Sequence, residues 1–275
     1  MAADMRLFSV RAKFLPIALI ATVFGCSTPA ERIDRIANAA GFIRNTVSGD
    51  PFEHLILTEN TEGVGYTDLH IYIEGDGSPW IANRWVATDP TPRSPVMLEL
   101  MQLDPGPTLY LGRPCYFGLQ QNCESVHWTS GRYSETVVES MIVALNTTIE
   151  QLDLRGDIVL IGHSGGGVLA MLLAPRIPNV DTLVTLAANL DIDRWTQYHG
   201  YSPLLLSLNP ATQAPLPDHI VQLHLVGESD SNVPIQLVRP VVDREPDAQL
   251  LQYPGYDHNC CWAEIWPSIL DRLRM

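Results

Sequence analysis

Short runs of hydrophobic residues alternate along most of the chain with stretches in which hydrophobic positions recur every three or four residues. The short runs predict β-strands, and most are apolar almost throughout, which is typical of strands buried on both faces. They lie at His54–Thr58, Leu69–Glu74, Thr108–Leu111, Asp157–Ile161, Thr182–Leu186, Ile220–Val226 and Leu250–Tyr253. The helical stretches lie at Tyr133–Gln151, Gly166–Arg176 and Trp262–Arg274.

The alternation of strands and helices predicts an α/β fold with a mostly parallel sheet and helices on both faces. Upstream of the first strand, residues 30–47 show a helical pattern that places Ile33, Ala37 and Ile43 on one face. Residues 187–219 leave room for an ordinary helix and loop or for a small cap, but not for a cap domain. We expect little or no cap over the carboxyl ends of the strands, where ligand sites of such sheets lie.

The N-terminus has the composition of an export signal. A positively charged start (Arg6, Arg11, Lys13) precedes the apolar run Phe14–Phe24. This run is too short to cross a bilayer as a helix, which takes roughly 20 residues. The pattern therefore predicts a cleavable signal peptide over residues 1–25.

The run closes with the residues Val-Phe-Gly-Cys at positions 23–26, and this end resembles the lipobox of bacterial lipoproteins. The resemblance implies that Cys26 becomes the lipidated first residue of the mature chain. Ser27 behind it, in place of Asp, is similar to the outer-membrane sorting signal. We expect a signal peptide (1–25), an N-terminal anchor and helix (26–51) and one main domain (52–275), anchored by lipid to the outer membrane and facing the periplasm.

Composition limits the partners of the protein. The 275 residues are 46% hydrophobic and 17% charged, which is a globular composition, and the formal net charge is −14. Such a surface repels phosphate groups, so nucleic-acid binding is excluded as a function. The expected contact with a membrane is through the lipid anchor alone.

Four cysteines remain beyond Cys26, and four cysteines allow three pairings. Cys115 and Cys123 stand eight positions apart in a polar loop, so a disulfide between them is our first choice. Cys260 and Cys261 are adjacent, and the sequence leaves open whether they bond to each other, stay reduced or pair with the other loop. No CxxC motif is present and the histidines are scattered, so we expect no metal site.

A GxSxG motif, Gly162–Gly166, follows the predicted strand Asp157–Ile161 and precedes a helix rich in Ala and Leu. A strand feeding into this motif and a helix leaving it form the setting of a nucleophile elbow, in which a tight turn exposes the serine. Ser164 is therefore the candidate nucleophile. The backbone N–H of Gly165, near the helix start, is positioned to donate to a developing oxyanion.

A serine hydroxyl needs a base and an orienting acid, which in this fold follow the serine in the order acid, then histidine. The strand Ile220–Val226 leads into Asp230, our candidate acid, with Glu228 as the fallback. His258 follows the last strand and is the only histidine after Asp230, so it is the candidate base.

An oxyanion hole usually takes a second N–H from the loop after an earlier strand. The strand Leu69–Glu74 ends in Gly75-Asp76-Gly77, where two glycines let the backbone approach a ligand closely. The N–H of Asp76 is the candidate donor, with Gly75 or Gly77 as neighbours.

From about residue 52 onward, these motifs resemble the α/β-hydrolase superfamily in order and spacing. The oxyanion loop departs from the His-Gly-Gly-Gly type of some lipases, because Glu74 stands where a histidine is common. The resemblance implies a serine hydrolase, a carboxylesterase, that cleaves a small-molecule ester through an acyl-enzyme without a cofactor. The alternatives are an acyltransferase with the same triad and a non-catalytic envelope lipoprotein with a binding role.

Overall fold

The computed structural model describes residues 27–59, 68–82 and 84–273. Its main sheet has the strand order β1-β2-β6-β3-β7-β8-β9-β10. The strands are β1 (Ile43–Ser48), β2 (Glu53–Thr58), β3 (Leu69–Ile73), β6 (Thr108–Leu111), β7 (Ile158–His163), β8 (Val180–Leu186), β9 (Val221–Gly227) and β10 (Gln249–Tyr253). The pairs β1–β2 and β2–β6 are antiparallel, and all other pairs are parallel. The predicted fold class is therefore confirmed.

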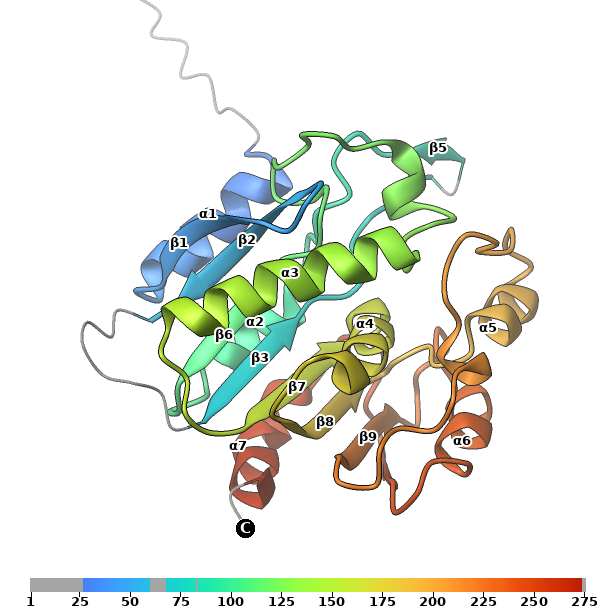
Figure 1. Ribbon diagram of the computed structural model, residues 1–275. Helices are drawn as coiled ribbons and strands as arrows, with labels where there is room; N and C mark the ends of the chain where they lie inside the picture. Colours follow the sequence, from blue (N-terminus) through green and yellow to red (C-terminus); the bar gives the residue numbers. More distant parts are fainter. Residues whose placement is uncertain (1–26, 60–67, 83, 274–275) are drawn as a thin grey trace, which may run out of the picture.

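Helices cover both faces of the sheet (Figure 1). On one face α3 (Glu135–Gln151) contacts β1, β2 and α4 (Gly165–Leu173), and α4 lies against β3, β7 and β8. On the other face α2 (Val96–Met101) packs on β3, β6 and α7 (Trp262–Leu273). The remaining helices are α1 (Pro29–Ala39), α5 (Ile192–His199) and α6 (Ile235–Val242), with 3₁₀ turns at Ser125–Trp128, Ala174–Arg176 and Pro210–Thr212.

The central strands are buried because their side chains meet helices on both sides. Every residue of β6 and β7 is buried, and so is every residue of α4. Burying a Leu or Ile side chain stabilises a fold by about 1.5–3 kcal/mol. This apolar core fixes the carboxyl ends of the strands, and with them the loops that follow Ile73, His163 and Gly227.

The single helix expected over residues 30–47 is wrong after Ala39. Gly41 has a φ of 83°, a left-handed conformation that ends a helix, and residues 43–48 form the edge strand β1. Ile43 is 41% exposed on that strand and does not continue the buried helix face. Ile33 and Ala37 of α1 are buried in the main core, so α1 and β1 belong to the same layered unit as the rest of the described chain.

Three further elements were not predicted from the sequence. They are α2, α6 and a two-stranded hairpin formed by β4 (Trp80–Ile81) and β5 (Trp85–Val86). Residues 187–219 contain only α5, one 3₁₀ turn and loop, which agrees with a light cap. The signal peptide, the lipobox and Cys26 lie outside the described residues.

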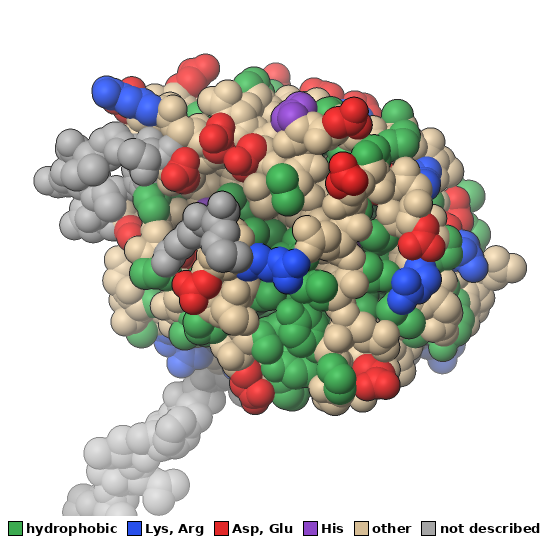
Figure 2. Space-filling view, turned by 90° about the horizontal axis from the view of Figure 1, so that it is seen from below, with side chains coloured by type: hydrophobic (Ala, Val, Ile, Leu, Met, Phe, Trp, Pro, Cys, Tyr) green, Lys and Arg blue, Asp and Glu red, His purple; other side chains and the backbone are tan. Residues whose placement is uncertain are grey.

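Acidic side chains are spread over the face seen in Figure 2, with basic side chains between them. This distribution fits the net charge of −14. No helix within the described ranges has the length and apolar character needed to cross a membrane.

Candidate active site

Ser164 occupies a sharp turn between β7 and α4. Its φ of 52° and ψ of −122° are unusual for a residue with a side chain, and such strain is held only when the surroundings enforce it. The flanking glycines allow the turn, because a Cβ on Gly162 would lie 2.3 Å from the carbonyl oxygen of Gly166. A Cβ on Gly166 would lie 2.1 Å from the carbonyl oxygen of Ile73. The motif therefore packs strand, turn and helix together and turns Ser164 toward the end of the sheet.

The structure brings the three predicted triad side chains together. His258 Nε2 lies 3.0 Å from Ser164 Oγ, and His258 Nδ1 lies 2.9 Å from Asp230 Oδ2. Asp230 follows β9 and His258 follows β10, so the parallel strands deliver both side chains to the edge where Ser164 lies. This arrangement can pass a proton from the serine hydroxyl to the imidazole.

Asp230 is held in its ionised form. Burial raises the pKa of its carboxyl group, but hydrogen bonds from His258 and from the N–H groups of Val233 and Asn232 outweigh burial and lower the pKa below its usual value. Oδ1 accepts both backbone N–H groups at 2.8 Å, which leaves Oδ2 for the imidazole. Glu228, the fallback acid, is exposed and does not join the group.

Two side chains beside the triad form hydrogen bonds with the backbone of the loop that carries His258. His163 Nε2 lies 2.7 Å from the backbone oxygen of His258, and burial lowers the pKa of His163 to about 3. His163 is therefore neutral and donates this hydrogen bond. Asp257 accepts the N–H groups of Asn259 and Cys260 and so stabilises the turn. Neither side chain takes the place of His258 or Asp230 in the hydrogen-bonded chain to Ser164.

The loop after β3 lies directly against the serine turn. A Cβ on Gly75 would be 3.3 Å from Ser164 Cβ, and a Cβ on Gly165 would be 2.0 Å from Asp76 Oδ1. The backbone N–H groups of Asp76 and Gly165 donate to no residue in the described part of the chain. Both are therefore free to donate to an oxygen of a bound substrate, which is the role expected for them.

The Asp76 side chain is clamped by a buried polar cluster. Its Oδ1 accepts from Arg113 at 2.5 Å, and its Oδ2 accepts from Arg132 at 2.9 Å and from the Tyr133 hydroxyl at 2.6 Å. The Tyr116 hydroxyl donates to the Asp76 backbone oxygen at 3.0 Å. These four side chains fix both the carboxylate and the backbone of Asp76.

The charges of this cluster do not cancel. Burial by itself raises the pKa of Asp76, but the guanidinium groups of Arg132 and Arg113 hold that pKa well below its usual range. Burial also raises the pKa of Tyr133 well above its usual value, so the hydroxyl stays neutral. One carboxylate thus faces two arginines, and the groups of this cluster nearest Gly165 are the Asp76 carboxylate and the Tyr133 hydroxyl. The arginines therefore act on the site by holding Asp76 ionised and in place.

Glu74, directly before this loop, is buried and accepts the N–H groups of Gly75 and Met97 at 3.2 and 3.1 Å. Burial outweighs these hydrogen bonds and raises the pKa of Glu74 to about 8. Glu74 is thus mainly neutral at pH 7, and it ties the start of the oxyanion loop to the start of α2.

The site opens into a cleft of about 820 Å³. Ser164 and His258 lie in its wall together with aromatic and hydroxyl side chains. These include Trp80, Trp195, Tyr201, Ser78, Ser94, Thr129, Ser130 and Ser202. The cleft is therefore both polar and aromatic, and residues from the α5 segment form one side of it.

The four cysteines among the described residues form two disulfides. Cys115 is bonded to Cys123, as the loop spacing suggested, and Cys260 is bonded to Cys261. The described residues contain no group of three or more His, Cys, Asp or Glu side chains arranged to hold a metal.

Sequence reasoning missed the clamp on Asp76. Arg113 and Arg132 are 37 and 56 positions away from Asp76 and lie in segments without clear periodicity. A single arginine in a loop normally predicts an exposed residue. The local sequence therefore carried no signal for either contact.

No protein-family model and no curated protein sequence matches this chain. Solved structures are similar to it in fold. An esterase from Pyrococcus furiosus aligns with a TM-score of 0.59 at 13% identity, over 91% of this chain and 95% of that one. Est1E from Butyrivibrio proteoclasticus aligns with a TM-score of 0.56 at 14% identity, over 84% of this chain and 97% of that one. A putative lipase from Acinetobacter baumannii aligns with a TM-score of 0.57 at 14% identity, over 90% of this chain and 95% of that one. The chain has the α/β-hydrolase fold.

Proposed function

We propose that the protein is a serine hydrolase that cleaves carboxylic esters. The observation that carries this proposal is the continuous hydrogen-bonded chain from Ser164 through His258 to Asp230, with Ser164 on a strained turn. A structural serine needs neither the strain nor an aligned imidazole. The similarity in fold to proteins described as esterases and as a putative lipase supports esters as the substrate class.

The mechanism follows from the geometry. His258 Nε2 takes the proton of Ser164 as the oxygen attacks the ester carbonyl, while Asp230 holds the Nδ1–H and stabilises the imidazolium. The N–H groups of Asp76 and Gly165 bind the oxyanion. His258 then returns the proton to the departing alcohol, which leaves an acyl group on Ser164. A water molecule, deprotonated by His258, releases the acid and restores the serine.

The direct test is turnover of 4-nitrophenyl esters with acyl chains of two to sixteen carbons, together with labelling by a fluorophosphonate probe. We expect ester hydrolysis and stoichiometric labelling at Ser164, because the probe reacts with an activated serine. A folded protein that neither turns over any ester nor reacts with the probe would contradict the proposal. Product analysis with added alcohol distinguishes a hydrolase, which forms the acid, from an acyltransferase, which forms a new ester.

We further propose that the chain is exported and lipidated at Cys26 and acts at the bacterial outer membrane. The support is the sequence pattern of residues 1–26, together with two disulfides, which persist in oxidising compartments. Bacterial cells that express the full chain are expected to incorporate labelled palmitate into it, and Cys26→Ser is expected to abolish that incorporation. Equal labelling of both chains would refute lipidation at Cys26.

A further inference from the structure

Exposed hydrophobic side chains gather around the mouth of the cleft. Among the described residues, twelve large hydrophobic side chains are prominently exposed, and eight of them belong to two segments beside the site. We call these eight the apolar rim: Trp80, Ile81, Trp85, Val86, Tyr198, Tyr201, Leu205 and Leu206. Monomeric proteins rarely keep such a concentration of apolar surface unless it contacts something.

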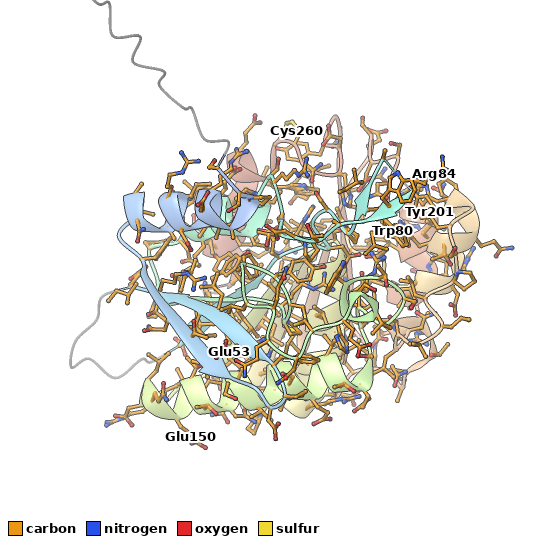
Figure 3. The ribbon with its side chains drawn as sticks, turned by 90° about the horizontal axis from the view of Figure 1, so that it is seen from above. Glu53, Trp80, Arg84, Glu150, Tyr201 and Cys260 are labelled. Atoms are coloured by element: carbon orange, nitrogen blue, oxygen red, sulfur yellow. A yellow bond between two sulfur atoms is a disulfide. The ribbon has the colours of Figure 1, made fainter. Side chains whose placement is uncertain are left out.

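Both halves of the rim contribute a side chain to the lining of the cleft. Trp80 comes from the β4–β5 hairpin, Tyr201 follows α5, and both line the same cleft as Ser164. Trp80, Arg84 and Tyr201 lie together at one end of the molecule, away from Glu53 and Glu150 (Figure 3). A surface that contacts the rim would therefore be presented directly to the proposed nucleophile.

The rim is held in place by the surrounding structure. In the hairpin, the Ala87 N–H donates to Pro79, and the Trp128 Nε1–H donates to the Ala87 oxygen. On the other side, the ring of Tyr201 stacks on His199, with 5.0 Å between their centroids. His199 in turn hydrogen-bonds to the backbone oxygen of Asn232 at 2.7 Å. The hairpin backbone and the ring of Tyr201 are thus held in place, and all eight rim side chains stay exposed in the folded chain.

The charge of the rim differs from that of the rest of the protein. The chain has a net charge of −14, yet neither residues 78–88 nor residues 195–217 contain an Asp or a Glu. The single Lys or Arg in these two segments is Arg84, whose guanidinium lies 5.2 Å from the ring centroid of Trp85. Exposed tryptophans with an arginine beside them are suited to a lipid–water interface, where the rings enter the headgroup region and the cation meets phosphate.

We propose that the apolar rim docks the protein onto a lipid–water interface, so that lipid esters enter the cleft directly from that surface. This contact would be additional to the lipid anchor, which the sequence alone led us to expect as the sole membrane contact. The part concerning lipid esters rests on the proposed ester hydrolysis, whereas the docking does not. A lipid surface fits the rim better than a protein partner because it needs apolar area and an absence of acid, and it needs no pattern of directional hydrogen bonds. The polar groups of the eight side chains are the N–H of two tryptophans and the O–H of two tyrosines, and such rings suit an interface with one apolar and one wet side.

The experiment uses residues 27–275, which contain every described helix and strand and lack the cysteine proposed to be lipidated. Binding to phosphatidylcholine vesicles is measured by co-sedimentation and by the tryptophan emission maximum. Trp128, Trp262 and Trp266 are buried, and Trp195 is half-buried with its Nε1–H bonded to Asn232. A blue shift therefore reports mainly on the exposed Trp80 and Trp85. We expect the wild-type chain to bind with a blue shift, and Ser164→Ala to bind equally well.

The test variant is the double substitution Trp85→Ser and Leu205→Ser. Neither side chain lines the cleft, and they are 62% and 83% exposed, so their loss removes no core contact. The vesicle partition coefficient is expected to fall at least tenfold. Hydrolysis of a long-chain ester embedded in the vesicles should fall at least tenfold too, with kcat/KM on soluble 4-nitrophenyl acetate within twofold of wild type. The matched control is Val221→Ser, which removes a 57% exposed side chain at the start of β9 and should leave vesicle binding intact.

Three results would overturn the proposal. The wild-type chain shows no vesicle binding, or Val221→Ser weakens binding as much as the rim variant does. The third result is that the wild-type chain has no affinity for vesicles but is a dimer in sedimentation velocity, and that the rim substitutions make it a monomer. The rim would then be an interface with a second copy of the chain. Vesicle binding without ester turnover would instead contradict the proposed function and leave the docking in place.

Discussion

Ser164→Ala is expected to lower kcat for ester hydrolysis by about 10⁴- to 10⁶-fold, because the nucleophile and its proton transfer are lost together. The change removes one oxygen and no packed carbon, so the free energy of unfolding should stay within about 1 kcal/mol of wild type. Steady-state kinetics on the preferred 4-nitrophenyl ester and chemical denaturation measure the two quantities. The control is Ser268→Ala on the exposed face of α7, which should leave both unchanged.

The triad side chains should act as one unit. His258→Ala alone is expected to cost nearly as much as Ser164→Ala, and the double variant should be little worse than either. The reason is the hydrogen bond of 3.0 Å between His258 Nε2 and Ser164 Oγ, which makes the base useful only to this serine. Multiplicative losses in the double variant, or full activity of Ser164→Ala, would contradict the assignment of the nucleophile.

Asp76→Asn is expected to be the most damaging isosteric change near the site. It leaves Arg113 and Arg132 buried without a carboxylate, and breaking a buried ion pair in this way costs about 3–5 kcal/mol of unfolding free energy. The loop that carries the Asp76 N–H would lose its anchor, and loss of one oxyanion donor lowers kcat by about 10²- to 10³-fold. Denaturation and steady-state kinetics on the same variant measure both effects.

The pH dependence of stability gives a second readout for Asp76. Its pKa in the folded state lies below the value in the unfolded chain, so the unfolded chain binds more protons over that interval. Stability from this group is therefore fully present above the unfolded pKa, about 4, and is lost as the pH falls below it. In Asp76→Asn, the free energy of unfolding should therefore fall less than in the wild type as the pH is lowered below about 4.

The control for Asp76 is Asp153→Asn, which breaks an exposed ion pair with Arg155. Exposed pairs contribute about 0–1 kcal/mol, so this variant should resemble wild type in stability and in kcat. If Asp76→Asn were no less stable than Asp153→Asn, the cluster around Asp76 would not hold the loop, and the proposed oxyanion site would lose its structural basis.

Local sequence patterns were enough to predict the sheet and the meeting of Ser164, His258 and Asp230. Continuous apolar runs predicted β3, β7, β8 and β9 to within one or two residues at most ends, because a strand buried on both faces needs apolar side chains throughout. Parallel strands end at one edge, so the positions of Ser164, Asp230 and His258 directly after β7, β9 and β10 were enough to predict that they meet.

The sequence was not enough to predict an element correctly where its local pattern was weak or fitted more than one kind of structure. The helical pattern predicted over residues 30–47 includes Ile43, yet residues 43–48 form β1 because β2 offers a strand edge that pairs with them over six residues. Tertiary pairing overrides a weak local preference of this kind. The hairpin that carries Trp80 and Trp85 was missed because its strands have two residues each, too few to produce an alternating pattern.

What the sequence by itself determined about this protein is its fold and the identity of three side chains that converge, since both follow from burial and chain order. Only the tertiary structure decided how Asp76 is held and where the apolar rim lies. Arg113 and Arg132 resemble surface residues until the fold encloses them around one carboxylate. Exposure of the rim likewise depends on which surfaces the rest of the chain leaves uncovered, and no local pattern encodes that.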